Sequence, residues 1–359
     1  MASRPSEEER ERLLMTTQPP LPPGMVPIAL DVMGGDFAPA ETVAGAVLAA
    51  SKGGVAVLLV GDPAAIHAEL KKHPAAAKLP LIPVPSEGVV LEGEHPAMAF
   101  RSKPRASVFV AAGAVKAGKA KAFVSMGSTG ATIAAATVVL GTMEGIERGA
   151  LGAPIIGFAP KQVIIDLGSN MDTKPQMLVD MAALGAAMAR IVLDVPEPRI
   201  AILSVGSEEG KGNRLVREAT ELIKQTSLKF VGNVEGNDLP FGKAEVVICD
   251  GFVGNVVMKL TEGLGEAVAH EIEKRLGATH QAKELAKHLF DLMNVGEVYG
   301  GGPLFGVKGV AIVGHGRAKA ASVANAIMTA KMVVDKGYLE AAAAELAKAR
   351  SQVKAQPAG

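Results

Sequence analysis

Five short turns along the chain combine glycines with polar or charged side chains, and each follows an apolar run that is typical of a strand. The residues of these turns that are candidates for binding an anion are Gly34, Gly35, Asp36, Gly127, Ser128, Thr129, Gly130, Asn170, Asp172, Lys174, Lys211, Asp250 and Asn255. Where a glycine turn opens a helix, exposed backbone amides and the positive end of the helix dipole favour phosphate. A single turn of this kind is more often a tight turn with a capping aspartate. The recurrence of the pattern predicts a polar crevice that handles phosphate.

Cationic side chains in or near these turns are candidates for balancing the charge of a bound phosphate. They are Arg101, Lys103, Lys174 and Lys211. Lys103 lies in the basic stretch FRSKPRAS, which is equally consistent with a solvated positive face. We expect Asp36, Asp172 and Asp250 either to order the cations or to cap helices. His315, which has a glycine on either side at the end of an apolar run, is a candidate proton donor.

Signatures of several other enzyme classes are absent from the sequence. The stretch GSEEGKG is one residue short of the Walker A spacing and has glycine where serine or threonine should follow the lysine. No G-x-G-x-x-G follows the first strand, which argues against a dinucleotide fingerprint. His270 and Glu271 lack the second histidine of a zinc protease. Because no other ligand cluster is evident, we expect neither a metal nor a cofactor.

Composition and charge narrow the classes further. The 359 residues are 48% hydrophobic and 21% charged, which is typical of a globular chain with a large core. Lysine and arginine together number 37, as do aspartate and glutamate, so no global positive field points to a nucleic-acid partner. The single cysteine, Cys249, excludes an internal disulfide and favours a reducing compartment, so we expect a cytoplasmic protein.

The chain divides by pattern into three parts. Residues 1–25 contain a Glu/Arg run and a proline cluster without the apolar stretch of a secretory signal, so we expect a flexible leader. Residues 26–347 are expected to form one domain, and residues 348–359 a flexible tail at the end of the last helix. Charged residues or glycine interrupt every apolar run before it reaches the length of a membrane span.

Short runs rich in Val, Ile and Leu alternate with Ala-rich segments of helical spacing. The expected strands are 26–32, 55–60, 121–126, 163–167, 199–205, 244–250 and 309–313. Strands that are apolar on both faces and separated by helices predict an α/β fold with a mostly parallel sheet and helices on both faces. Such three-layer, Rossmann-like sheets bind ligands beyond the carboxyl ends of their strands, where the glycine turns are expected.

The segment from about 256 to 294 lacks a strand pattern. Apolar residues recur at helical spacing on both sides of Gly277 and form two stripes, made by Leu260, Leu264, Val268, Ile272 and Leu276 and by Leu285, Leu289, Leu292 and Met293. This spacing predicts a protruding pair of helices joined by a turn. The stripes are expected to pack on each other or on a second subunit.

The ordered set of turns closely resembles one family, the phosphate acyltransferases called PlsX. The matching stretches are IALDVMGGDFAP, VSMGSTGA, IIDLGSNMDTKP, LSVGSEEGKGN, FVGNVEGNDL, VICDGFVGNVVMKLTEG and GGPLFGVKGVAIVGHG, which span about residues 26–316. The resemblance implies a fold similar to phosphotransacetylases and isocitrate-type dehydrogenases, a homodimer, and transfer of a fatty acyl group from acyl carrier protein to inorganic phosphate. It further implies that a glycerol-3-phosphate acyltransferase uses the acyl phosphate for phospholipid synthesis.

The sequence departs from the pattern of this family in two places. Ser128 stands where the family usually has asparagine. Residues 317–319 are Arg-Ala-Lys, whereas the family usually has Ser-Ser-Asp after the pair formed by His315 and Gly316. The second change removes two hydroxyls and a carboxylate and adds two cations, so reduced or altered activity is among the expectations.

The resemblance implies attack of a phosphate dianion on a thioester, so the site has to position the reactants and stabilise the developing oxyanion. We expect the amides of the turns at 34–35 and 127–130, together with the cations, to hold the phosphate. We assign catalytic roles to His315, Lys174 and Asp36. His315 is expected to donate a hydrogen bond to the carbonyl oxygen or to protonate the leaving thiol.

The resemblance also implies peripheral attachment to the membrane through the helix pair. The residues expected to contact anionic lipid or the acidic acyl carrier protein are Lys274, Arg275, Lys283, Leu289 and Phe290. Three other functions stay open. They are a phosphotransacetylase-like enzyme that uses acyl coenzyme A, an isocitrate-type dehydrogenase, and a catalytically impaired scaffold for enzymes of lipid synthesis.

Overall fold

The computed structural model describes most of the chain, namely residues 24–94, 96–277 and 279–353. The expected leader therefore lies outside the described residues, apart from Gly24 and Met25. The last helix, α13 (Tyr338–Gln352), continues beyond residue 347, where the tail was expected to begin, and residues 354–359 lie outside the described part. The boundaries of the single expected domain stay a prediction.

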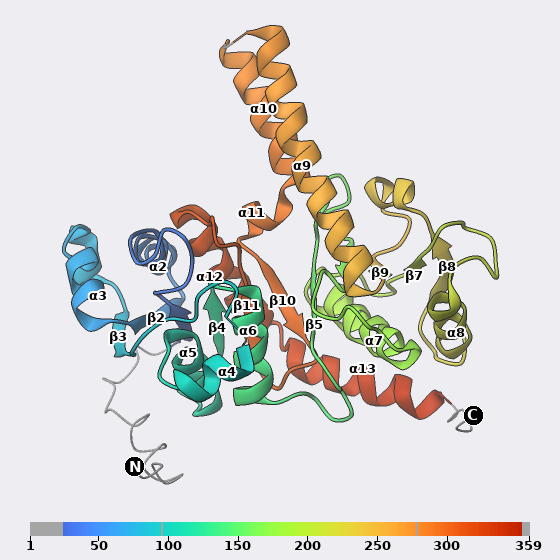
Figure 1. Cartoon of the computed structure of the whole chain (residues 1–359), viewed down its shortest axis with the longest axis horizontal. Coiled ribbons are helices and arrows are strands. Elements are labelled where there is room, and N and C mark those ends of the chain that lie inside the picture. Colours follow the sequence, from blue (N-terminus) through green and yellow to red (C-terminus); the bar gives the residue numbers. More distant parts are fainter. Residues whose placement is uncertain (1–23, 95, 278, 354–359) are drawn as a thin grey trace. The chain divides into compact units, whose positions relative to one another are not determined.

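Contacts between elements divide the described chain into two compact units (Figure 1). The first unit contains the described residues up to Gly141 and also Gly309–Lys331. The second unit contains Thr142–Lys308 and the described residues from Met332 onward. Each unit therefore combines segments that are far apart in the sequence.

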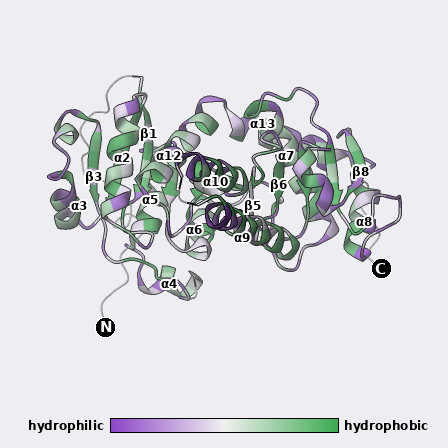
Figure 2. Cartoon of the chain, turned by 90° about the horizontal axis from the view of Figure 1, so that it is seen from above, coloured by the Kyte–Doolittle hydropathy of each residue, from purple (hydrophilic) through white to green (hydrophobic). Residues whose placement is uncertain are grey.

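The strands of the first unit form a wholly parallel sheet. They are β1 (Val26–Asp31), β2 (Val55–Gly61), β3 (Leu81–Pro85), β4 (Ala122–Ser125) and β11 (Val310–Val313), in the order β3-β2-β1-β4-β11. Every residue of β2, β4 and β11 is buried, as expected for strands covered on both faces, and β1 is coloured as hydrophobic in Figure 2. The outermost strand, β3, is half-exposed and contains prolines, which an edge strand tolerates.

Helices cover both faces of this sheet. They are α2 (Ala40–Lys52), α3 (Pro63–Leu70), η1 (Pro74–Lys78), α4 (Pro96–Ser102), α5 (Ser107–Lys116), α6 (Thr129–Ala135), η2 (Ala136–Leu140) and most of α12 (Ala320–Asp335). α2 packs closely on α12, since a Cβ atom at Gly45 would lie 2.5 Å from Val323 Cβ. α5 packs on β1, β4 and α6 on the opposite face (Figure 1). α2 begins at Ala40, directly after Pro39.

The second unit holds a mostly parallel sheet. Its strands are β5 (Ala150–Ala153), β6 (Val163–Ile165), β7 (Ile200–Leu203), β8 (Phe230–Val234), β9 (Val246–Ile248) and β10 (Gly302–Phe305), in the order β10-β5-β6-β9-β7-β8. β5 is antiparallel to both of its neighbours, and the pairs β6–β9, β9–β7 and β7–β8 are parallel. The carboxyl ends of β6, β9 and β7 therefore share one edge, which positions the glycine turns that follow them.

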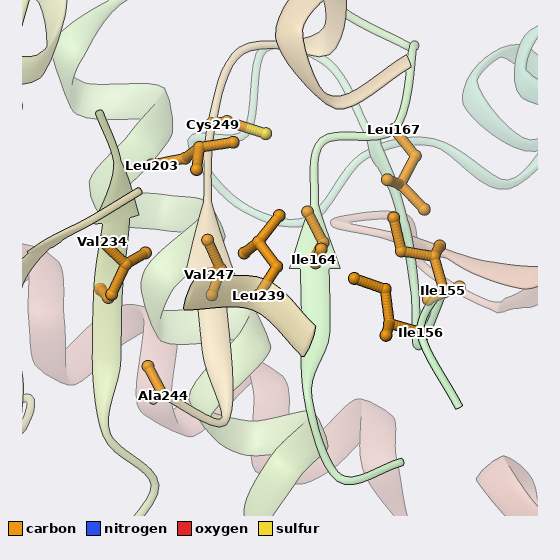
Figure 3. Close-up of a cluster of buried hydrophobic side chains, with 12 residues drawn as sticks. Ile155, Ile156, Ile164, Leu167, Leu203, Val234, Leu239, Ala244, Val247 and Cys249 are labelled. Atoms are coloured by element: carbon orange, nitrogen blue, oxygen red, sulfur yellow. The ribbon is translucent and has the colours of Figure 1, made fainter. Parts of the chain in front are cut away.

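Helices also cover both faces of the second sheet. They are α7 (Pro175–Ile191), α8 (Arg214–Ile223), η3 (Gly236–Phe241), α9 (Gly251–Leu276), α10 (His280–Met293), α11 (Val295–Tyr299) and α13. On one face α7 packs with α8 and α13, and Gly185 of α7 lies directly against Val246 of β9. On the other face, η3 and α9 cover an apolar cluster that includes Ile164, Val247 and Cys249 (Figure 3). Burial raises the pKa of the Cys249 thiol, which makes this cysteine an inert part of the core.

The helices α9 and α10 pack on each other and extend away from the sheet of the second unit (Figure 1). Gly277, with a φ of 70°, ends α9, and Thr279 caps α10 by accepting a hydrogen bond from Ala282 N at 3.2 Å. Gly265 permits the close packing, because a Cβ there would lie 2.9 Å from Met293 Cβ. The predicted pair of helices with a turn after Gly277 is thereby confirmed.

The predicted α/β fold with a mostly parallel sheet between helices is confirmed. All seven predicted strands are present, as β1, β2, β4, β6, β7, β9 and β11. β3, β5, β8 and β10 were not predicted, and each contains glycine or proline, which weaken the strand signal. None of the helices in the described part of the chain combines the length and the apolar character that crossing a membrane requires.

Candidate active site

A buried carboxyl organises the turn that follows β1. Asp31, the last residue of β1, is 2% exposed, and burial raises its pKa. Its Oδ2 accepts a hydrogen bond from Ser125 Oγ at 2.8 Å, and the same hydroxyl accepts one from Gly127 N at 3.1 Å. The amides of Met33 and Gly34 also donate to the carboxyl. One carboxyl thus joins the turn after β1 to the turn after β4.

Three turns of the first unit approach one another backbone to backbone. A Cβ atom at Gly34 would lie 2.8 Å from Gly127 N, so only glycine fits there. Gly35 has a φ of 101°, a conformation that favours glycine, and a Cβ there would lie 3.2 Å from Gly316 O. Asp36 N donates a hydrogen bond to the same carbonyl at 2.8 Å. The structure therefore brings together the predicted turns at 34–36 and 127–130 and adds the turn after β11.

The turn after β4 leads directly into α6. Ser128 is the N-cap of this helix, and its hydroxyl accepts a hydrogen bond from Ala131 N at 3.5 Å. Thr129 and Gly130 are exposed in the first turn. The amide of Gly127 is already bonded to Ser125, so a phosphate at this turn has to be met by the amides that follow Gly127.

His315 follows β11 at the third of these turns and is half-buried. Its carbonyl oxygen accepts a hydrogen bond from Ala318 N at 3.0 Å, which shapes the segment that departs from the family pattern. Lys319 lies over the ring of Phe37 at 3.0 Å from its centroid, so one of the two added cations contacts the turn after β1. Glu41 of α2 accepts a hydrogen bond from Ala320 N at 2.7 Å and thereby caps α12. These contacts fasten the third turn to the first.

The basic stretch at 100–107 is partly neutralised by its own neighbours. Lys103 Nζ forms an ion pair with Glu94 Oε1 at 2.6 Å and donates a hydrogen bond to Val89 O at 3.2 Å. Arg101 is exposed in the last turn of α4, and this helix packs on α6. Of the two predicted cations in this stretch, Lys103 therefore already has a carboxylate partner.

A second buried carboxyl, Asp166, shapes the loop that follows β6 in the second unit. Its Oδ1 accepts hydrogen bonds from the amides of Leu151, Gly168 and Ser169 at 3.2, 3.1 and 3.0 Å. Its Oδ2 accepts two more at 2.8 Å, from the backbone amide and the side-chain amide of Asn170. Burial raises the pKa of Asp166, and these donors oppose that shift. Asn170 is 1% exposed and therefore belongs to the inner wall of the loop.

The loop after β6 is joined to the turn after β9. Gly251 N donates to Asn170 O at 2.8 Å, and Asn255 Nδ2 donates to Leu167 O at 3.4 Å. Asp250 is the N-cap of α9 and accepts a hydrogen bond from the first turn of this helix at 2.9 Å. Of the two expected roles of Asp250, ordering a cation or capping a helix, its contact in the structure is that of a helix cap.

The remaining predicted polar residues of the second unit lie near its surface. Lys174 forms an exposed ion pair with Glu147 at 2.7 Å, and this contact lowers the pKa of the glutamate. Lys211 and Asp172 are also exposed. The turn that carries Lys211 is held by Asn233, whose Nδ2 donates to three of its carbonyl oxygens. Among the described residues, no group of three or more His, Cys, Asp or Glu side chains is placed to hold a metal ion.

Sequence reasoning assigned no role to Asp31, Ser125 or Asp166, which hold the turns in place. The signal that identifies the two aspartates is a carboxylate at the end of a strand buried on both faces. A charge in that position has to be satisfied by nearby N–H or O–H groups, so it organises the turn that follows.

Comparison with known proteins gives three concordant findings. A family model described as "Fatty acid synthesis protein" matches residues 26–341. A phosphate acyltransferase from Heliobacterium modesticaldum is 42% identical over 322 residues, covering 88% of this chain and 96% of that protein. A phosphate acyltransferase from Gloeobacter violaceus is 41% identical over 328 residues, covering 88% and 95%.

Solved structures show the same fold at low sequence identity. A phosphotransacetylase from Streptococcus pyogenes superposes with a TM-score of 0.58 at 19% identity, covering 87% of this chain and 95% of that chain. A phosphotransacetylase from Staphylococcus aureus gives a TM-score of 0.52 at 15% identity, covering 86% and 94%. At these identities the likeness concerns the three-layer α/β architecture.

Proposed function

The chain belongs to the phosphate acyltransferase family, and on that premise we propose that it transfers a fatty acyl group from acyl carrier protein to inorganic phosphate. The structural observation that supports this proposal is the set of three joined turns in the first unit, at Gly34, Gly127 and Gly316. Their close backbone packing leaves no room for side chains, which suits a cradle for a small anion.

In the proposed reaction, an oxygen of the phosphate dianion attacks the carbonyl carbon of the acyl thioester. The carbon–sulfur bond breaks, the acyl phosphate forms, and the thiolate of the carrier takes up a proton. Holding both reactants in place and stabilising the developing oxyanion supply most of the acceleration, because the nucleophile is already charged. The chain therefore has to provide donors and positioning rather than a covalent residue.

The predicted catalytic residues keep distinct roles in this proposal. His315, at the third turn, donates a hydrogen bond to the carbonyl oxygen or gives the proton to the leaving thiol. Asp36 helps to fix that turn, because its amide bonds to Gly316 O. Lys174 stays a predicted catalytic residue of the second unit, and its exposed ion pair with Glu147 can be given up at little cost, since such a pair contributes little to stability.

Trapping with hydroxylamine tests the reaction directly, because an acyl phosphate reacts to give a hydroxamate. Thioesters also react, so the informative quantity is the hydroxamate that requires both enzyme and phosphate. We expect such product with acyl carrier protein as donor and much less with acyl coenzyme A. A preference for acyl coenzyme A would favour the phosphotransacetylase-like alternative, and no phosphate-dependent product with either donor would favour the scaffold.

The helix pair is proposed to place the enzyme at the cytoplasmic membrane surface, where a glycerol-3-phosphate acyltransferase uses the acyl phosphate. Leu276 and Leu285 lie close to the turn between the helices and are 57% and 44% exposed. The neighbouring cations are partly neutralised, because Lys274 and Arg275 both pair with Glu271. Moderate charge beside exposed leucines suits weak, reversible attachment.

The predicted membrane or carrier contacts Leu289 and Phe290 are half-buried on α10, whereas Lys283 is exposed. In the proposal, Leu289 and Phe290 form the inner part of the contact, farther from the turn than the exposed leucines. Lys283 adds a cation on the α10 side. The exposed pair of leucines is therefore the better position for a test that leaves the packing of the two helices intact.

A homodimer is proposed from a different stretch of α9. The side chains of Phe252, Val256, Leu260 and Leu264 are each at least half exposed and recur every four residues along one side of the helix. A stripe of this kind suits packing against a second copy of the chain. Sedimentation velocity tests it: a dimer is expected for the wild type, and replacing Val256 and Leu260 with lysine should give monomers.

A further inference from the structure

The hydrogen bonds between Asp31, Ser125 and Gly127 have a fixed direction. The Ser125 hydroxyl donates its hydrogen bond to Asp31 Oδ2, because a carboxylate oxygen can only accept. The hydroxyl oxygen then accepts from Gly127 N. The orientation of the peptide before Gly127 is thus set by a carboxyl on another strand, which lies 94 residues before Ser125 in the sequence.

Neither side chain of this relay is placed to touch a substrate. Ser125 is fully buried, and Asp31 is 2% exposed. Gly34 lies directly over the carboxyl, since a Cβ there would be 2.6 Å from Asp31 Oδ2. The relay therefore supports the inner side of the turns whose amides form the cradle.

We propose that Asp31 and Ser125 are positioning residues for phosphate, which hold the turns at Gly34 and Gly127 in the arrangement that binds the anion. This inference rests on the proposed function, and it attributes the affinity of the protein for phosphate to the position of these two turns. Without the hydroxyl, Gly127 N and Asp31 Oδ2 lose their shared partner, and the turn that presents the following amides is free to rotate. Small displacements of donors weaken binding strongly, because hydrogen bonds depend on distance and angle.

The matched control is a second buried serine near the same carboxyl, whose hydroxyl has no hydrogen-bond partner among the described residues. Ser107, the first residue of α5, is fully buried and adjoins Asp31. Ser107 lies on α5, whereas the bond to Gly127 comes from Ser125. Ser107→Ala and Ser125→Ala therefore remove the same atom from the surroundings of one carboxyl, and only the second interrupts the relay.

Two measurements separate positioning from general damage. The first is the steady-state rate as phosphate and acyl donor are varied separately. The second is the rise in the midpoint of thermal unfolding that inorganic phosphate produces without any acyl donor, since a ligand that binds the folded state stabilises it. The second measurement does not require turnover.

Ser125→Ala is expected to raise the KM for phosphate roughly tenfold, the scale on which one missing buried hydrogen-bond partner acts. The KM for the acyl donor should change little, and the phosphate-induced rise in the unfolding midpoint should be lost. Asp31→Asn should show a smaller change than Ser125→Ala, because its side-chain oxygen still accepts from Ser125. Ser107→Ala should keep the phosphate response of the wild type.

The inference is overturned if folded Ser125→Ala keeps the phosphate KM of the wild type, or if Ser107→Ala loses the phosphate response equally. A wild type that forms no acyl phosphate would remove the proposed function instead. In that case the phosphate-induced shift of the wild type and of Ser125→Ala still decides whether the relay serves an anion site.

Discussion

Asp31 in the first unit and Asp166 in the second are buried carboxyls at the carboxyl ends of parallel strands, yet they act on their surroundings differently. Asp166 accepts four N–H bonds from the loop that directly follows it, and a fifth from Leu151. Asp31 accepts a hydroxyl from β4 and through it fixes Gly127. The same feature thus shapes one loop in the second unit and joins separate turns in the first.

The difference predicts a division between stability and activity. A carboxyl that gathers the donors of its own loop chiefly determines whether that loop folds. A carboxyl that joins turns from separate strands chiefly determines how those turns present their amides. Substitutions in the two units should therefore separate the free energy of unfolding from the binding of phosphate.

The largest effect is expected at Asp166. Asp166→Ala leaves five N–H groups without their acceptor, and we expect the free energy of unfolding to fall by about 3 kcal/mol or more. Asp31→Ala leaves fewer donors without an acceptor and should cost less. Urea unfolding followed by circular dichroism measures both, and a larger loss for Asp31→Ala would reverse the comparison.

His315 should show the opposite behaviour, with activity lost and stability kept. It is half-buried at the third turn of the first unit, so His315→Ala is expected to lower kcat about 100-fold. The midpoint of urea unfolding should stay close to that of the wild type. His67→Ala, an exposed histidine of α3, is the control. Turnover equal to the wild type would remove His315 from the mechanism.

The pH dependence of stability offers a third test. Burial raises the pKa of folded Asp31 above its ordinary value of 3.8, against opposing hydrogen bonds from Ser125 and the amides of Met33 and Gly34. Between the two pKa values the folded state binds more protons than the unfolded state, so the free energy of unfolding falls as pH rises.

Asp31→Asn should therefore flatten the decline in stability from pH 4 upward, because it removes the titrating carboxyl. Urea unfolding of both proteins at a series of pH values measures the difference. Parallel pH profiles for the wild type and Asp31→Asn would contradict this prediction, because they would mean that Asp31 has the same pKa in the folded and the unfolded state.

Much of the fold follows from local sequence patterns. Runs such as 55–60 and 309–313 are apolar throughout, and strands buried on both faces require this. β5 (ALGA) and β10 (GPLF) were missed because short segments with glycine and proline carry no such signal. Their strand conformation depends on pairing with neighbours, which the sequence does not reveal locally.

The candidate site was predictable only in part. Glycine turns such as 34–35 were found because a tight turn after a strand needs glycine. The relay from Asp31 to Gly127 was missed, because its residues meet only when β1 and β4 become neighbours. For the same reason, the sequence did not show that Lys174 already has Glu147 as partner. Partners of side chains are a property of the packed chain.

The smallest effect is expected at the helix pair, where the second unit is proposed to meet the membrane. We predict weak, salt-sensitive binding to vesicles that contain anionic lipid. Replacing both Leu276 and Leu285 with glutamate should abolish it, because buried apolar area and positive charge both contribute to such binding. Pelleting of the protein with sedimented vesicles at low and high salt measures the effect.

Replacing Leu276 and Leu285 with glutamate should leave phosphate-dependent turnover unchanged when it is measured in solution without vesicles. This result would sharpen the contrast between the units. The control variant replaces Leu260 and Leu264, which are exposed to a similar degree on the same helix but farther from the turn, with glutamate. If the turn region alone makes the contact, this control should still bind vesicles, even where it alters the oligomeric state.

Equal pelleting of the wild type and the Leu276/Leu285 variant would exclude the leucines near the turn as the contact. Equal loss of pelleting in both variants would mean that oligomerisation rather than the turn governs attachment. Loss only in the variant near the turn would assign membrane contact to the end of the helix pair and leave the chemistry with the joined turns of the first unit.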